Sequence, residues 1–139
     1  MAADGGRNEA GDHMRLTLLV VEGAYAVCRL AADAPRPAWA AGGRFASVTR
    51  TPDELSVVCE QDAVPADVRC ERGWRALRVA GTLDFAMTGV LASLVGPLAG
   101  AGVPVFVIST FDTDYLFLKE QEFARGVEAL RQAGHEVGS

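Results

Sequence analysis

The chain has 139 residues and a net charge of −5, which leaves room for one ordinary domain or two very small ones. Half of the residues are hydrophobic and 22% are charged, a balance typical of folded globular proteins. Lys and Arg are scattered and only 7% of the residues are aromatic, so we expect no nucleic-acid partner. No apolar run approaches the roughly 20 residues that a membrane span needs, so we expect no membrane partner either.

The first part of the chain predicts short strands. Residues 1–13 are rich in Gly, Ala and Asp without apolar periodicity, so we expect a disordered tail and no secretion signal. Residues 16–21 and 25–30 are extended runs with β-branched members, separated by a turn at Glu22 and Gly23. Two prolines then forbid a long helix and leave one or two helical turns around Trp39.

A hairpin is predicted in the middle of the chain. Residues 45–50 and 55–60 are strand-like, and the Thr-Pro-Asp-Glu sequence at residues 51–54 has the chemistry of a turn. Residues 61–73 mix charges with Pro and Gly. They predict the connection between two halves of the chain.

The second half begins with a strand, a loop and a helix. Residues 74–79 alternate apolar residues with arginines, as a strand with one buried face does. A loop at residues 81–89 leads into a helix whose apolar face comes from residues 90–98. Pro97 should kink or tighten the last turn of this helix before Gly100 and a further glycine stop it.

Two more strands and a second helix complete the pattern. Residues 103–108 are continuously apolar, as expected for a strand buried on both faces or nearly so. A polar turn at residues 109–114 leads to a strand at 115–118, two glutamates open the second helix, and residues 135–137 can add an edge strand. The order β-α-β-β-α-β predicts an α+β, ferredoxin-like sandwich, an antiparallel sheet with both helices on one face.

Motifs for catalysis or metal binding are missing from the sequence. His13 and His135 have no partner at a triad-like spacing, and no clustered metal ligands or phosphate-binding loop is present. Cys28, Cys59 and Cys70 lie far apart without a C-x-x-C motif, so we expect reduced cytoplasmic thiols that act as small buried hydrophobic residues. We therefore expect no catalytic residue, no metal and no cofactor.

Two polar clusters remain as candidate binding residues. Thr82, Asp84 and Thr88 precede the first helix of the second half, where Asp84 or Thr88 caps the helix or the helix N–H groups face a ligand carboxylate. The sequence leaves both interpretations open.

The second cluster lies in the turn at residues 109–114. It is either an ordinary Asx or Ser/Thr turn or a binding site for an ammonium or guanidinium group, since Asp112 and Asp114 share a face if the segment is extended. Phe111 supplies an apolar or cation–π surface or, as we expect of a single Phe, fills the core.

Residues 45–59, 73–93 and 107–120 resemble the small bacterial tandem ACT proteins, relatives of the CASTOR-type arginine sensors of animals. The Ile-Ser-Thr-Phe-Asp-Thr-Asp-Tyr segment that begins at Ile108 is the most specific part of the resemblance. The resemblance implies two ACT modules, an abbreviated one at residues 14–66 and a complete one at 67–139. It also implies a homodimer, because the animal sensors carry four modules in one chain.

In the resembling proteins an amino acid binds between ACT modules, at the loop after the first strand and the turn after the second. The resemblance therefore points to Gly81–Gly89 and Ser109–Asp114, and within them to Thr110, Phe111 and Asp114. The expected ligand-binding residues are Thr82, Asp84, Thr88, Gly89, Ser109, Thr110, Phe111, Asp112 and Asp114.

We expect a cytoplasmic, amino-acid-binding regulatory protein without catalysis of its own, with arginine or lysine as the first ligands to test. Its protein effector is unknown. The alternatives are a dimerisation or docking module without a ligand and, with less support, a small enzyme that uses Asp84 or Asp114 as a base.

Overall fold

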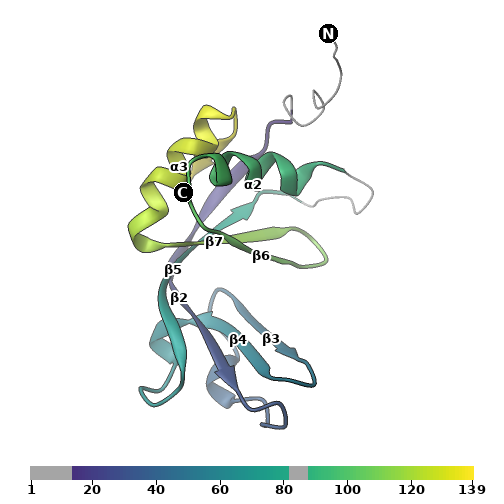
Figure 1. Ribbon diagram of the computed structural model, residues 1–139, viewed down its shortest axis with the longest axis vertical. Coiled ribbons are helices and arrows are strands. Elements are labelled where there is room, and N and C mark those ends of the chain that lie inside the picture. Colours follow the sequence, from purple (N-terminus) through teal and green to yellow (C-terminus); the bar gives the residue numbers. More distant parts are fainter. Residues whose placement is uncertain (1–13, 82–87) are drawn as a thin grey trace. The chain divides into compact units, whose positions relative to one another are not determined.

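The computed structural model describes residues 14–81 and 88–139, so the expected tail at 1–13 and part of the loop at 81–89 lie outside the described residues. Figure 1 shows the helices and strands, whose bounds are β2 Thr17–Leu30, β3 Ala46–Arg50, β4 Leu55–Glu60, β5 Cys70–Val79, α2 Val90–Gly100, β6 Phe106–Ser109, β7 Asp114–Lys119, α3 Phe123–Gln132 and β8 Glu136–Gly138. Three short 3₁₀ helices accompany them: η1 Ala38–Ala40, η2 Gln61–Ala63 and η3 Glu120–Glu122.

The chain forms two compact units, each with its own core. The hairpin unit comprises Glu22–Ala76, and the helical unit comprises Leu77–Ser139 together with the chain up to Val21. Strands β2 and β5 contribute residues to both units, because the division falls inside each of them. The module boundaries at 14–66 and 67–139 stay a prediction of the sequence.

The helical unit has the predicted ferredoxin-like architecture. Its elements follow the order β5-α2-β6-β7-α3-β8, and its strands lie in the order β8-β2-β5-β7-β6. Both helices cover the same face of the sheet (Figure 1). The α+β fold class is therefore confirmed, with one addition: the start of β2 lies between β8 and β5, and it runs parallel to β8, with Thr17 opposite Glu136.

Alternating residues of the sheet and one stripe of each helix build the core of the helical unit. Residues two apart on a strand point to the same face, and residues four apart on a helix lie on the same side. The buried side chains that meet there include Leu77 and Val79 of β5, Leu116 and Leu118 of β7, Leu94 and Leu98 of α2, and Val127 and Leu130 of α3. This packing fixes which face of the sheet the helices cover.

His135, just before β8, ties the two ends of the helical unit to α2. Its ring is buried; Nδ1 accepts the backbone N–H of Leu16 at 3.1 Å, and Nε2 lies 2.9 Å from the carbonyl oxygen of Ser93. A neutral ring with its proton on Nε2 satisfies both contacts, since that nitrogen then donates to the carbonyl. The histidine is therefore a structural residue in this unit.

The hairpin unit confirms the predicted hairpin. Its strands lie in the order β3-β4-β2-β5, and β3 and β4 pair antiparallel up to Arg50 opposite Leu55. The N–H of Thr51 donates to the carbonyl of Glu54 at 2.9 Å and closes the turn. The helical turn expected around Trp39 is η1.

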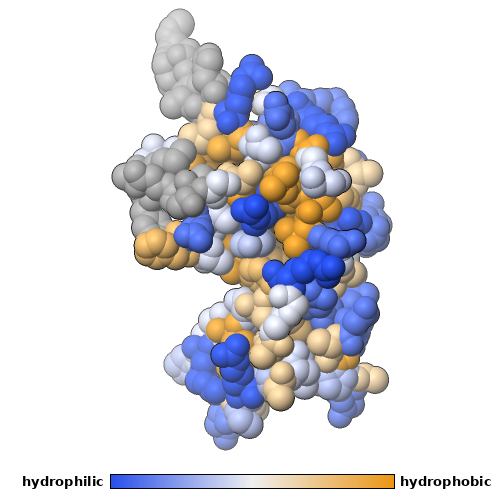
Figure 2. Space-filling view, turned by 180° about the vertical axis from the view of Figure 1, so that it is seen from behind, coloured by the Kyte–Doolittle hydropathy of each residue, from blue (hydrophilic) through white to orange (hydrophobic). Residues whose placement is uncertain are grey.

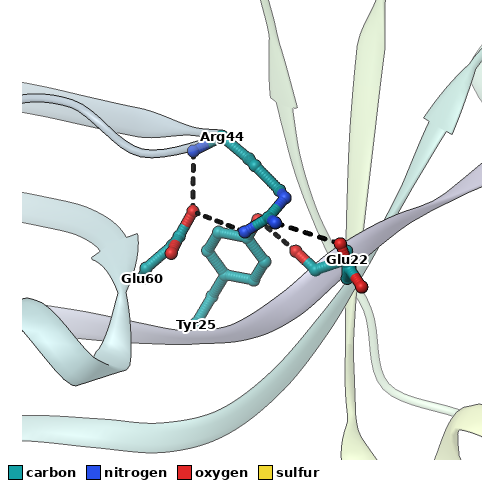
Figure 3. A network of polar contacts seen from close by, with 4 residues as sticks. All are labelled: Glu22, Tyr25, Arg44 and Glu60. Carbon is teal, nitrogen blue, oxygen red and sulfur yellow. Dashed lines mark hydrogen bonds and ion pairs between the residues drawn. The ribbon is translucent and has the colours of Figure 1, made fainter.

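A polar network holds the segment before β3 against β2 and β4 (Figure 3). The backbone N–H of Arg44 donates to Glu60 at 2.6 Å, and its guanidinium donates to the carboxylate of Glu22 at 3.0 Å. Beneath them the buried Tyr25 donates its hydroxyl to the Glu22 carbonyl at 3.0 Å and meets Phe45 edge to face. The exposed ion pairs contribute little, so the buried Tyr25 and Phe45 rings supply most of the stability here.

Two strand boundaries differ from the prediction. The turn expected at Glu22 and Gly23 is wrong, because β2 runs through both residues as one strand. Gly23 takes a φ of 106°, which a glycine adopts without steric cost, and the strand continues with new partners on β4. Strand β5 likewise begins at Cys70, inside the predicted connection at 61–73.

Strand β6 also departs from the prediction. The apolar run at residues 103–108 was expected to be buried on both faces, but β6 lies at the end of the strand order and its apolar residues are half-buried. Phe106 stacks on Phe117 of β7 with ring centroids 4.7 Å apart. Because both helices lie on one face, the opposite face keeps apolar side chains at the surface, and Figure 2 shows hydrophobic surface on this unit.

The three cysteines lie in the hairpin unit. Cys28 and Cys59 are buried in its core, as expected of small hydrophobic residues, and Cys70 packs against that core half-buried. Burial, followed by the neighbouring Cys59 and Cys70, raises the pKa of Cys28 from 9.0 to about 12. Burial also raises the pKa of Cys59.

Gly126 offers a test of the helix packing. A Cβ at this position would lie 2.3 Å from Cδ2 of Leu118 and 3.2 Å from Cδ2 of Leu98, both of which are fully buried. We expect Gly126→Ala to lower the free energy of unfolding by about 1–3 kcal/mol in urea denaturation. The matched control is Gly100→Ala at the end of α2, where nothing lies within 4 Å of the new methyl group; it should be neutral or stabilising. Equal effects of the two substitutions would contradict the packing.

The raised thiol pKa predicts a loss of stability at alkaline pH. Above about pH 9 the unfolded chain releases the Cys28 proton, whereas the folded chain keeps it until about pH 12. The free energy of unfolding should therefore fall by roughly 1–3 kcal/mol between about pH 8 and pH 11. Because other groups titrate there too, the measurement is the difference in urea stability between the unsubstituted chain and Cys28→Ala, which should lose less. An identical decrease in both would refute the assignment.

Candidate functional site

The turn between β6 and β7 contains most of the predicted site residues. Ser109 and Asp114 are the last paired residues of the two strands, and the N–H of Thr110 donates to the carbonyl of Thr113 at 2.8 Å. The hydroxyl of Thr110 lies 3.1 Å from the same carbonyl and accepts the N–H of Thr113 at 3.3 Å. Thr110 therefore holds the turn in shape, as the Ser/Thr-turn interpretation expects.

The two carboxylates of this segment have different surroundings. Asp112 is exposed in the bend, whereas Asp114 is the first residue of β7 and only 9% exposed. The hydroxyl of Ser109 donates to Oδ1 of Asp114 at 2.6 Å, which orients that carboxylate. Because Asp112 lies in the bend and not in a strand, the prediction that Asp112 and Asp114 share one face of an extended segment is wrong.

A buried hydrogen bond joins this turn to the end of β5, the strand that precedes the other predicted segment. The hydroxyl of Thr113 is buried and donates to the carbonyl oxygen of Val79, the last residue of β5, at 2.7 Å. Gly81, where the predicted binding loop begins, follows Val79 by two residues and takes a φ of 83°. The structure thus places the turn beside the start of that loop. The sequence gives no sign of this bond, because a threonine in a polar turn carries no signal for a partner 34 residues away.

The other end of the loop forms the start of α2. Gly89, with a φ of 82°, is the N-cap residue, and it has no side chain with which to cap the helix. Thr88 is exposed and does not occupy the N-cap position, so the prediction that it caps the helix is wrong. Thr82 and Asp84 lie outside the described residues.

Phe111 lies at the tip of the turn. Its side chain is 78% exposed, so the expectation that it fills the core is wrong. The short turn explains the exposure, since the bend at residues 111–112 projects beyond the last strand pair, Ser109 and Asp114. A large apolar side chain exposed in this way is a candidate contact for a ligand or a partner surface.

The described residues contain no group of three or more His, Cys, Asp or Glu side chains that could hold a metal ion. Within the same ranges, neither helix has the length and apolar character that crossing a membrane requires.

Comparisons with known proteins agree with this architecture. The ACT-domain family model matches residues 69–132, and a model described as the N-terminal domain of a group of related proteins matches residues 23–67. A solved structure of a protein from Agrobacterium tumefaciens is 40% identical, with a TM-score of 0.86, over 91% of this chain and 95% of that one. The fold and the match show that residues 69–132 of this chain form an ACT domain.

More distant relatives include animal and bacterial regulatory proteins. The cytosolic arginine sensor for mTORC1 subunit 1 is 34% identical over 67 residues in Bos taurus and 35% over 67 residues in Homo sapiens. Each match covers 48% of this chain and only 20% of the sensor. The regulatory subunit of aspartate kinase from Thermus thermophilus, 13% identical with a TM-score of 0.57 over 81% of this chain and 93% of its own, shares the fold.

The substitution Thr113→Val tests the hydrogen bond between the β6–β7 turn and the end of β5. The substitution keeps the shape of the side chain and removes the 2.7 Å bond to the buried carbonyl of Val79, which keeps a longer contact from the Arg78 guanidinium at 3.5 Å. The free energy of unfolding should therefore fall by about 1 kcal/mol. Urea denaturation measures the change, with the exposed Thr88→Val as the control that should stay within about 0.5 kcal/mol of the parent. If both variants were as stable as the parent, the bond would have no role in positioning the turn.

Proposed function

We propose that this chain is a non-catalytic regulatory protein that binds a free amino acid at the β6–β7 turn, beside the end of β5. The hydrogen bond between Thr113 and Val79 supports the proposal most directly, since it holds the β6–β7 turn against the end of β5, two residues before the other candidate segment begins. The ACT-domain match and the arginine sensors among its relatives support an amino acid as the ligand.

The chemistry of the turn fits the charged groups of an amino acid. Asp114, held by Ser109, is an oriented carboxylate for an ammonium or guanidinium group, and Asp112 adds a second negative charge at the surface. The N-terminus of α2, capped by Gly89 without a side chain, favours a carboxylate by its dipole. We rank arginine and lysine first because each carries a second cationic group for the second carboxylate.

The proposal includes a cytoplasmic homodimer. A second copy would rebuild the four-module arrangement that the resemblance to the animal sensors implies, and those sensors are described as cytosolic. The bound amino acid would then change the affinity for a protein effector.

A thermal-shift screen against the common amino acids tests the binding proposal. At a concentration 100 times its Kd, a ligand adds about 2.7 kcal/mol to the stability of the folded state, so arginine or lysine should raise the melting temperature by several degrees. Asp114→Asn should abolish the shift, because it removes the charge and keeps an oxygen that can accept the Ser109 hydroxyl.

The matched control is Asp67→Asn, an exposed carboxylate in the hairpin unit, which should leave the shift unchanged. A full shift in Asp114→Asn, or loss of the shift in both variants, would remove Asp114 from the site. If no amino acid moves the melting temperature of the unsubstituted chain, the binding proposal fails.

The exposed Phe111 favours one alternative, a dimerisation or docking module that needs no small ligand. In that case Phe111→Ser should weaken self-association, measured by light scattering, or the retention of a partner protein, whether or not an amino acid is present. Under the binding proposal the same substitution should instead lower the ligand affinity.

A further inference from the structure

The hairpin unit brings three cysteines together from three different strands. Cys28 lies on β2, Cys59 on β4 and Cys70 at the start of β5, which are neighbouring strands of one sheet. The sequence shows no sign of this cluster because its members are far apart along the chain. Among the described residues no group of three or more His, Cys, Asp or Glu side chains that could hold a metal ion is found, these three cysteines included.

Cys28 and Cys70 are the closest pair of this cluster by strand geometry. The N–H of Arg29 donates to the carbonyl of Arg69 at 3.0 Å, so the residue before Arg29 faces the residue after Arg69 across the antiparallel β2–β5 pair. Cys70 is also close enough to Cys28 to contribute, after burial and Cys59, to its raised pKa. Cys59, by contrast, pairs with Ala26 and is therefore diagonal to Cys28.

The position of this pair suits a cross-strand disulfide. Residues that face each other in a non-hydrogen-bonded antiparallel pair have Cα atoms about 4.5 Å apart, within the range of roughly 4.4–6.8 Å that disulfides span. The diagonal pair of Cys28 and Cys59 is farther apart, at roughly 7–8 Å. Neighbouring backbone strands would therefore need little movement to join Cys28 to Cys70.

We propose that Cys28 and Cys70 form an oxidation site, at which hydrogen peroxide or an organic peroxide converts the two thiols into a disulfide between β2 and β5. The thiolate of Cys70 attacks a peroxide oxygen, the O–O bond breaks, and Cys70 becomes a sulfenic acid with release of water or alcohol. The Cys28 sulfur then attacks the Cys70 sulfur, the S–O bond breaks, and the hydroxyl leaves as water with the Cys28 proton. One peroxide is reduced and two thiols are oxidised.

Exposure decides the order of the two steps. Cys70 is half-buried and reaches solvent, whereas Cys28 is only 1% exposed and Cys59 only 2%. Burial holds the pKa of Cys28 at about 12, so this thiol is protonated at neutral pH and reacts poorly with peroxide on its own. Cys28 faces Cys70 and can attack its sulfenic acid to form the disulfide. This second step should become faster as the pH rises, because more of Cys28 is then the thiolate.

Peptide mapping of the oxidised chain tests the proposal. The reduced full-length protein is treated with hydrogen peroxide, unfolded, alkylated and digested, and mass spectrometry identifies the linked peptides. We expect the free thiols to fall from three to one, with Cys28 joined to Cys70 within one chain and Cys59 alkylated. Cys59→Ala should form the same disulfide, and Cys70→Ser should form none.

Other products would overturn the proposal. A disulfide that contains Cys59, a disulfide between two chains, or Cys70 oxidised to sulfinic acid with Cys28 still free would each show that the pair is not the oxidation site. Where a substitution prevents folding, the mapping of the unsubstituted chain decides alone, since it needs no variant.

Discussion

The buried hydrogen bond from the Thr113 hydroxyl to the Val79 carbonyl is the contact on which the candidate site depends. It joins the turn after β6 to the end of β5, two elements from distant parts of the sequence. Losing this bond is costly, because the buried carbonyl of Val79 would keep only weaker hydrogen bonding, such as the 3.5 Å contact from the Arg78 guanidinium. The contacts of Thr110 and the bond between Ser109 and Asp114 then shape the turn around this anchor.

Strand pairing and the contacts of a buried histidine hold the first residues of β2 in the helical unit. The first residues of β2 pair with the short β8, and His135 accepts the N–H of Leu16 while its other ring nitrogen contacts the carbonyl of Ser93 in α2. A ferredoxin-like sheet built from residues 70–138 alone would lack this strand. The ACT fold here therefore includes a segment that lies outside the region of the ACT-domain match.

Two aspartates and two cysteines show how a difference in burial gives residues of the same type different properties. Asp112 is solvated at the tip of the turn and Asp114 is oriented within β7, although only one residue lies between them. Cys70 reaches solvent while Cys28, opposite it on β2, has its pKa raised to about 12 by burial. In both pairs the more exposed residue lies at or beyond a strand end, Asp112 in the bend and Cys70 at the start of β5.

The sequence by itself determined the order of elements from β5 onward, the hairpin at β3 and β4, and the helix ends at Gly100 and Gln132 to within a few residues, because periodicity and turn chemistry are local. It also identified the polar turn that contains Ser109, Thr110, Phe111, Asp112 and Asp114. Only the tertiary structure decided that β2 passes through Gly23 as one strand, that β6 lies at an edge, that Phe111 is exposed and that Cys28 faces Cys70. These features depend on which strands become neighbours, and strand pairing joins residues whose separation along the chain leaves no periodic or local signal.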